Sequence, residues 1–149
     1  MTLDKLVKYF AHNGDDIIAA YLFGSHAVGV ARDDSDIDIG VLLGKFPDSP
    51  TDYRIEKAME LEKILGKQVD FVIINQAPFI LQFQIFKEGK IIYEKDADKR
   101  ATYQMHFLSR YYDFKRFYDF HSRYLINEIK ERGLGVGYSS NRRKAPQAK

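Results

Sequence analysis

Two short segments decide the fold of this chain: Phe23-Gly24-Ser25 and, after ten intervening residues, Asp36-Ile37-Asp38. The apolar run 17–23 ends at Gly24, a pattern typical of a buried strand. Residues 36–43 are rich in Ile and Val and predict a second strand. A Gly-Ser pair therefore ends one strand, and an Asp-x-Asp pair begins the next.

Asp36 and Asp38 form an acidic pair on the second of these strands. Because side chains alternate across a strand, both carboxylates are expected on the same face. Two such groups repel each other, and a cation between them relieves the repulsion. Oxygen ligands favour hard ions such as Mg²⁺ or Mn²⁺. The alternative is an acidic pair on the solvated face of an edge strand, with no ligand.

Gly24 and Ser25 lie where a buried strand passes into a turn. Glycine lets the backbone approach a ligand closely, and a helix start offers free N–H groups to phosphate. The serine adds a hydroxyl donor. The alternative is an ordinary strand-to-helix turn in which Ser25 is the N-cap. A phosphate cradle close to a carboxylate pair is a stronger signal than either feature alone.

Asp70 lies within an apolar segment, Gln68-Val69-Asp70-Phe71-Val72-Ile73-Ile74. An acid in such a strand is costly to bury unless it is paired or bound to a metal ion. If this strand lies beside 36–43, Asp70 completes a cluster of three carboxylates. The alternative is that Asp70 lies at a strand end and meets solvent or a lysine.

The remaining elements follow from periodicity and from helix caps. Ser49 and Pro50 suit a helix start, and Gly66 suits the end of the same helix. The predicted segments are helices over 2–12, 50–65, 75–86 and 97–131 and strands over 69–74 and 90–94. This order predicts an α/β (α+β) domain with a small mixed sheet, flanking helices and a long C-terminal helix.

Composition narrows the class of protein. The 149 residues carry a formal charge of +2, and the last 17 hold four basic residues and no acid, which leaves −2 for residues 1–132. We therefore expect one domain over 1–132, a flexible basic tail over 133–149 and no binding of long nucleic acid. No run is apolar enough to span a membrane. The absence of cysteine fits a cytoplasmic protein.

Together, Gly24-Ser25, Asp36-Ile37-Asp38 and Asp70 resemble the motif of the nucleotidyltransferases of the DNA polymerase beta superfamily. The likeness covers roughly residues 17–94. The compact size is similar to that of the minimal nucleotidyltransferases (MNT), which include the MntA-type antitoxins of HEPN/MNT toxin–antitoxin pairs. The resemblance implies a palm-like mixed sheet.

The resemblance also implies the chemistry of the site. Two Mg²⁺ ions would be held by Asp36 and Asp38, and Asp70 would hold the ion that activates the attacking hydroxyl and accept its proton. Gly24 and Ser25 would bind the phosphates of ATP. One departure is the apolar Ala27-Val28 where many relatives have a basic or aromatic residue, so His26, Lys45 and Lys67 are candidate replacements.

Nine of the 21 aromatic residues lie between Tyr103 and Tyr124, in two stripes along the predicted C-terminal helix. One stripe is ordinary core packing, whereas a second favours docking to a partner, with Tyr111, Phe117 and Tyr124 as the expected anchors. The resemblance to the minimal nucleotidyltransferases implies transfer of AMP from ATP to a hydroxyl, preferably of tyrosine, on a cognate HEPN ribonuclease toxin. The alternatives are transfer to a small hydroxylated molecule such as an aminoglycoside, or a module that covers the toxin without catalysis.

Overall fold

The computed structural model describes residues 2–32 and 34–132, so the predicted tail over 133–149 lies outside the described residues. The elements in order are α1 (Thr2–Asn13), β1 (Ile17–Phe23), α2 (Ser25–Val28), β2 (Ile37–Leu43), α3 (Pro50–Leu65), β3 (Val69–Ile73), the 3-10 turn η1 (Ile74–Gln76), α4 (Phe79–Glu88), β4 (Lys90–Glu94) and α5 (Ala97–Arg132). This order confirms the predicted mixed α/β architecture with a long C-terminal helix.

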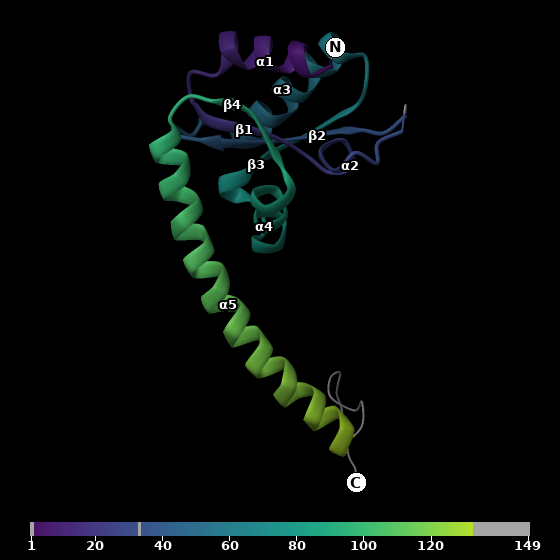
Figure 1. The fold of residues 1–149 in the computed structure, drawn as a ribbon, viewed down its shortest axis with the longest axis vertical. Helices are drawn as coiled ribbons and strands as arrows, with labels where there is room; N and C mark the ends of the chain where they lie inside the picture. The colour runs from purple at the N-terminus through teal and green to yellow at the C-terminus, as the bar shows by residue number, and fades with distance from the viewer. Residues whose placement is uncertain (1, 33, 133–149) are drawn as a thin grey trace. The chain divides into compact units, whose positions relative to one another are not determined.

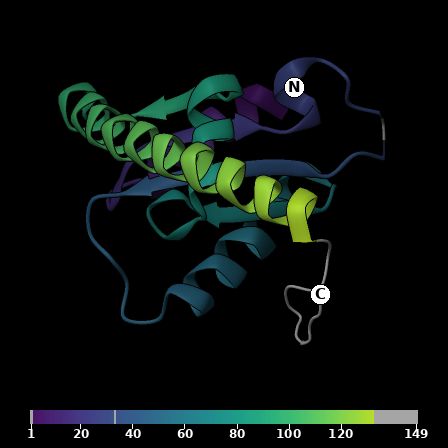
Figure 2. The same ribbon diagram turned by 90° about the horizontal axis from the view of Figure 1, so that it is seen from below.

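The four strands form one mixed sheet in the order β3-β2-β1-β4. β1 runs antiparallel to β2 and to β4, whereas β2 and β3 are parallel because α3 carries the chain back between them. The connection from β2 to α3 leaves the sheet as a wide loop (Figure 2). The C-terminal end of β1 therefore meets the N-terminal ends of β2 and β3 at one end of the sheet.

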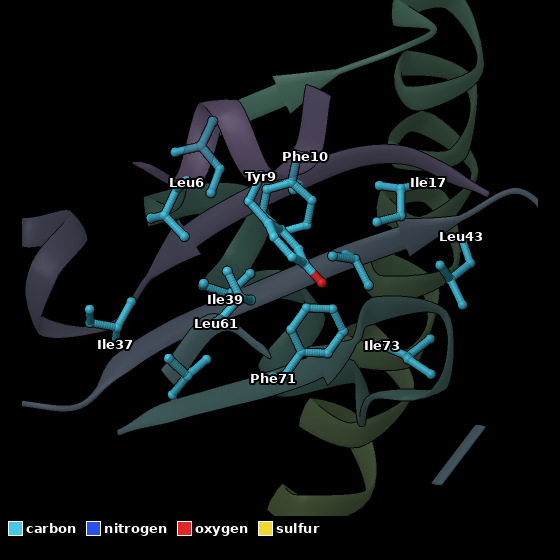
Figure 3. Packing of buried hydrophobic residues seen from close by; sticks show 14 residues of the cluster. Leu6, Tyr9, Phe10, Ile17, Ile37, Ile39, Leu43, Leu61, Phe71 and Ile73 are labelled. Atoms are coloured by element: carbon cyan, nitrogen blue, oxygen red, sulfur yellow. The ribbon is translucent and has the colours of Figure 1, made fainter. Parts of the chain in front are cut away.

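Helices cover both faces of the sheet. α1 and α3 lie on one face and α4 on the other (Figure 1). On the first face Leu6, Phe10 and Leu61 pack against β-strand side chains such as Ile39 and Phe71 (Figure 3). The opposite face buries a smaller cluster: Ala19, Tyr21, Phe23, Leu42, Ile74 and Ile85. Strand alternation therefore divides the apolar residues of β1 and β2 between two cores.

α3 is fixed at both ends by the predicted caps. The backbone N–H of Asp52 donates to Ser49 Oγ at 3.3 Å, and Gly66 ends the helix with φ 71°. The same helix satisfies the outer edge of β3. Val69 N–H donates to Glu62 Oε2 and Arg54 Nε donates to the Phe71 carbonyl, both at 3.1 Å. These bonds occupy edge groups that otherwise invite pairing with another strand.

The helix predicted over 75–86 is wrong at its start. Ile74–Gln76 form the 3-10 turn, and α4 begins only at Phe79. Pro78 is the reason, because its ring disfavours the helical conformation for the residue before it. Ala77 is accordingly extended, with φ −76° and ψ 154°. The predicted end of this segment at Gly89 is confirmed.

The chain divides into two compact units, residues 1–108 and 109–149. The first turns of α5 belong to the first unit, where Tyr103 donates to Gln82 Oε1 and Tyr21 donates to Gln104 Oε1, each at 3.0 Å. Burial raises the pKa of Tyr21 to about 12, so this hydroxyl remains a donor at neutral pH. The described part of the second unit is the remainder of α5.

Candidate functional site

The acids predicted for the site converge at one end of the sheet. Asp38 of β2 and Asp70 of β3 are direct partners in the parallel register. Alternation places both on the same side as Leu42 and Val72, which is the face that α4 covers. The predicted neighbourhood of the two strands is therefore confirmed. Asp36 directly precedes β2 and is exposed, as is Asp70, whereas Asp38 is half-buried.

The smaller apolar core, on the face that α4 covers, ends before it reaches these acids and leaves them accessible. A Cβ added to Gly40 would lie 3.1 Å from Ile74 and 3.3 Å from Ile85, so the side chains of the η1 and α4 region reach the sheet as far as Gly40. Asp38 lies two residues earlier on the same strand. The acidic end of β2 is therefore the first part of this face that the small core does not cover.

The carboxylates at this end of the sheet carry like charges and repel one another. The pKa of Asp38 is raised, first by burial, then by the negative charges of Asp70 and Asp36, while the nearby His26 acts in the opposite direction. Within the described residues, no group of three His, Asp or Glu side chains is arranged closely enough to hold a metal ion as it stands. The structure thus brings the acids together as repelling neighbours, and a cation binding among them would remove that repulsion.

Gly24 lies directly against the Asp38 carboxylate. Its backbone has φ 71°, a conformation that favours glycine, and an added Cβ would lie 2.0 Å from Asp38 Oδ2. Phe23, one residue earlier, is the register partner of Asp38 across β1 and β2. The glycine is therefore required both by the turn and by the close approach of the acid.

Ser25 is the first residue of α2, and the N-cap is Gly24, without a side-chain cap hydrogen bond. The alternative in which Ser25 caps this helix is therefore wrong. The Gly24 carbonyl accepts from the N–H groups of Ala27 and Val28, at 3.1 and 3.3 Å. This short turn holds the Ser25 hydroxyl next to the glycine that contacts Asp38.

Of the proposed basic replacements, His26 lies near the acids. Its charge acts on Asp38, and its Nε2 is 3.4 Å from the Ser35 carbonyl oxygen. Lys45 follows the far end of β2 and lines a different hollow, together with Asp15 and Lys95. The prediction for Lys45 is therefore wrong. No contact of Lys67 bears on its assignment, which stays a prediction.

Sequence reasoning missed the surroundings of Asp70. A hollow of 230 Å³ beside this acid is lined by Thr51, Arg54 and Ile55 of α3. Arg54 is held there by its bond to the Phe71 carbonyl. The spacing of residues along α3 does not indicate that Arg54 lies near Asp70, because this proximity depends on how the helix crosses the edge of β3.

The aromatic stripes of α5 are exposed over its second half. Phe117 is 62% exposed and Tyr124 is 60% exposed, and Tyr118 and Phe120 are exposed as well. Tyr111, also predicted as an anchor, is only 9% exposed. Tyr111 therefore does not belong to the accessible set, whereas Phe117, Tyr118, Phe120 and Tyr124 are exposed to a partner.

No helix within the described residues is both long and apolar enough to cross a lipid bilayer.

The chain is similar to known proteins in sequence and in fold. The chain is 33% identical over 95 residues to the protein adenylyltransferase MntA of Shewanella oneidensis. The aligned region covers 64% of this chain and 67% of that protein. A chain of a toxin–antitoxin crystal structure with AMP-PNP is 25% identical and superposes with a TM-score of 0.66, covering 87% of this chain and 99% of that chain.

A second solved structure, a tri-AMPylated HEPN toxin of Shewanella oneidensis in complex with an MNT antitoxin, shares the fold. Its matching chain is 23% identical, with a TM-score of 0.60 over 87% of this chain and 96% of that chain. Residues 4–98 match the family described as polymerase beta, nucleotidyltransferase, and this range contains Gly24, Asp38 and Asp70. The chain belongs to the polymerase beta nucleotidyltransferase family.

Proposed function

We propose that this protein transfers AMP from ATP to a hydroxyl of a HEPN-family toxin, preferably a tyrosine hydroxyl, and so acts as the antitoxin. The observation that carries the proposal is the meeting of Gly24, Asp38 and Asp70 at one end of the sheet. The homologous MntA is a protein adenylyltransferase, and a structural relative occurs with an AMPylated HEPN toxin. ATP as the donor fits a protein that acts in the cytoplasm.

The donor set at this end of the sheet fits divalent metal ions. Asp36, Asp38 and Asp70 offer only carboxylate oxygens, which Mg²⁺ and Mn²⁺ prefer, and their mutual repulsion favours a bound cation. We assign Asp36 and Asp38 as ligands of two ions and Asp70 as a ligand of one. When bound, the ions would neutralise charge on the triphosphate and on the attacking and leaving oxygens.

Gly24 and Ser25 are assigned to the nucleotide. The Gly24 backbone lies against Asp38, so phosphate held at this turn is also close to the carboxylates. The Ser25 hydroxyl supplies a donor at the same place. Positioning of this kind carries most of a phosphoryl-transfer reaction, because the chemistry needs little from the protein beyond orientation and charge stabilisation.

Asp70 is assigned to the acceptor side of the reaction. It is exposed, so an incoming side chain can reach it. The acceptor oxygen forms a bond to the α-phosphorus of ATP, the bond from that phosphorus to the bridging oxygen breaks, and pyrophosphate leaves. The hydroxyl proton passes to the Asp70 carboxylate and then to solvent.

The exposed half of α5 is assigned to the protein acceptor. Phe117, Phe120 and Tyr124 are each at least 60% exposed, and large aromatic side chains of this kind anchor protein interfaces. Two such stripes on one helix fit contact with a protein better than contact with a small hydroxylated molecule.

The test is the mass of the partner. The purified protein is mixed with the HEPN candidate from the neighbouring reading frame, with ATP and Mg²⁺, and the intact mass of the partner is recorded. We expect an increase by whole AMP units. The matched variant Asp36→Asn/Asp38→Asn keeps the shape of both side chains and should give no increase.

Separation of the two proteins distinguishes modification from simple covering. A modified toxin should remain inactive after the antitoxin is removed. An unchanged mass together with toxin activity that returns on separation would show that the protein acts only by covering its partner. Label on an added aminoglycoside instead of on the partner would favour the small-molecule alternative.

A further inference from the structure

His26 lies at the junction between the nucleotide turn and the acidic strand. It directly follows Ser25 on α2, and its side chain is half-buried. Nε2 is 3.4 Å from the carbonyl oxygen of Ser35, the residue before Asp36. Because a carbonyl oxygen only accepts, Nε2 carries a hydrogen in this contact, and the imidazolium form would present a second N–H donor at Nδ1 to a ligand.

α2 carries no lysine or arginine, and Arg54 is held at the outer edge of β3 by its bond to the Phe71 carbonyl. Among the groups that shift the pKa of Asp38, His26 is the basic one, and it lowers this pKa. Val28 and Val30, in the same segment, are apolar and are 51% and 67% exposed. Lys45 lies beside a hollow at the far end of the strands. A bound nucleotide brings several negative charges to a place that already holds three carboxylates.

We propose that His26 is a further nucleotide-binding residue, whose imidazole contacts the polyphosphate of ATP and supplies the cationic hydrogen bond that the apolar Val28 cannot. The inference rests on the proposed function, since it assumes a nucleotide at the Gly24–Ser25 turn. It extends the site by one side chain and explains how a turn with no lysine or arginine on α2 binds a triphosphate.

Binding of AMP-PNP and of AMP, each with Mg²⁺, tests this contact by calorimetry. His26→Gln keeps a donor able to reach the Ser35 carbonyl but has no charge. We expect it to raise the Kd for AMP-PNP about tenfold, equal to about 1.4 kcal/mol, because a charge-assisted hydrogen bond is lost. The Kd for AMP, which lacks the outer phosphates, should change much less.

Two further variants make the comparison specific. His26→Lys restores a positive charge and should return the Kd for AMP-PNP to within about threefold of the unsubstituted protein. His12→Gln is the matched control, because His12 is exposed on α1 and contacts only the Lys8 carbonyl among the described residues. It should leave both Kd values unchanged.

The outcomes separate this inference from the proposed function. If His26→Gln leaves the Kd for AMP-PNP unchanged, His26 only positions the Ser35 loop. The same conclusion follows if the variant raises the Kd values for AMP-PNP and AMP equally. Either result overturns this inference but not the proposed function. Failure of His26→Lys to recover binding overturns it as well. An unsubstituted protein that binds no AMP-PNP overturns the proposed function and this inference together. If His26→Gln does not fold, His26→Asn serves the same comparison.

Discussion

The two ends of the sheet use charge in opposite ways. At one end Asp36, Asp38 and Asp70 repel one another, and the pKa of Asp38 is raised. At the other end, three aspartates and three lysines line a hollow of 260 Å³, where Lys95 Nζ donates to the backbone carbonyl of Asp15 at 2.8 Å. Compensated charges favour the fold, whereas uncompensated charges at a half-buried position lower its stability.

The difference indicates where function is located in the sheet. A protein under selection for stability alone would not retain three neighbouring carboxylates with so little compensation, since strain and repulsion of this kind concentrate at functional sites. Both ends of the sheet are built from the same strands, so the difference in charge between the two ends does not come from different secondary-structure elements. The following predictions test this contrast, from the largest expected effect to the smallest.

The largest effect is expected for Asp70→Asn. The amide has nearly the same shape as the carboxylate but can neither accept the acceptor proton nor bind a metal ion as strongly. We expect the rate of AMP transfer to fall at least about 100-fold, the usual contribution of a general base, with little change in the Kd for AMP-PNP. Single-turnover transfer with labelled ATP measures the rate, and a normal rate would reduce Asp70 to a structural residue.

Gly24→Ala should affect both folding and transfer. The new methyl group would lie 2.0 Å from Asp38 Oδ2, and the φ of 71° is strained for alanine. We expect a loss of about 2 kcal/mol in the free energy of unfolding, measured by urea denaturation, and a fall in transfer.

Gly66→Ala is the matched control for this substitution. Gly66 has the same φ of 71°, but nothing lies within 4 Å of its added Cβ. Gly66→Ala should lower the free energy of unfolding by about 1 kcal/mol, from backbone strain alone, and should leave AMP transfer unchanged. Equal losses at the two glycines would show that the contact with Asp38 has no energetic weight.

The pH dependence of stability should report the repulsion around Asp38. Its pKa is higher in the folded protein than the ordinary 3.8, so the folded state binds this proton more tightly than the unfolded state does. The ionised carboxylate therefore lowers stability above the folded pKa, and the penalty disappears as the pH falls below 3.8.

Asp38→Asn removes this penalty. In the absence of divalent ions, we expect the variant to be more stable than the unsubstituted protein at pH 7 and the difference to shrink toward pH 3.5. Thermal unfolding across this pH range measures the difference. Added Mg²⁺ should reduce the advantage at pH 7, and an advantage that is independent of pH would exclude charge as its cause.

The smallest effect is expected at the opposite end of the sheet. Lys95→Ala removes one hydrogen bond to the Asp15 carbonyl at an exposed position. We expect a change of less than about 1 kcal/mol in the free energy of unfolding and no change in AMP transfer. Loss of transfer in this variant would mean that the two ends are coupled, and the contrast drawn between them would fail.

Much of the fold could be predicted from local patterns. The bounds of β1 and β4, the cap at Ser49 and the end of α3 at Gly66 agree with the sequence, because each depends on residues within a few positions. The error at the start of α4 was also local. Pro78 holds Ala77 in an extended conformation, and this effect outweighed the apolar pattern that predicted a helix from residue 75.

The sequence by itself indicated which residues are candidates for the site, since a Gly-Ser turn and an Asp-x-Asp pair are encoded within a short segment. It also predicted the strands that carry Asp38 and Asp70. Only the tertiary structure decided that Asp70 lies beside Asp38, that Gly24 contacts its carboxylate and that Lys45 lies at the far end. The physical reason is strand register. The parallel pairing of β2 with β3 depends on how α3 packs across the sheet, and no local pattern specifies that contact.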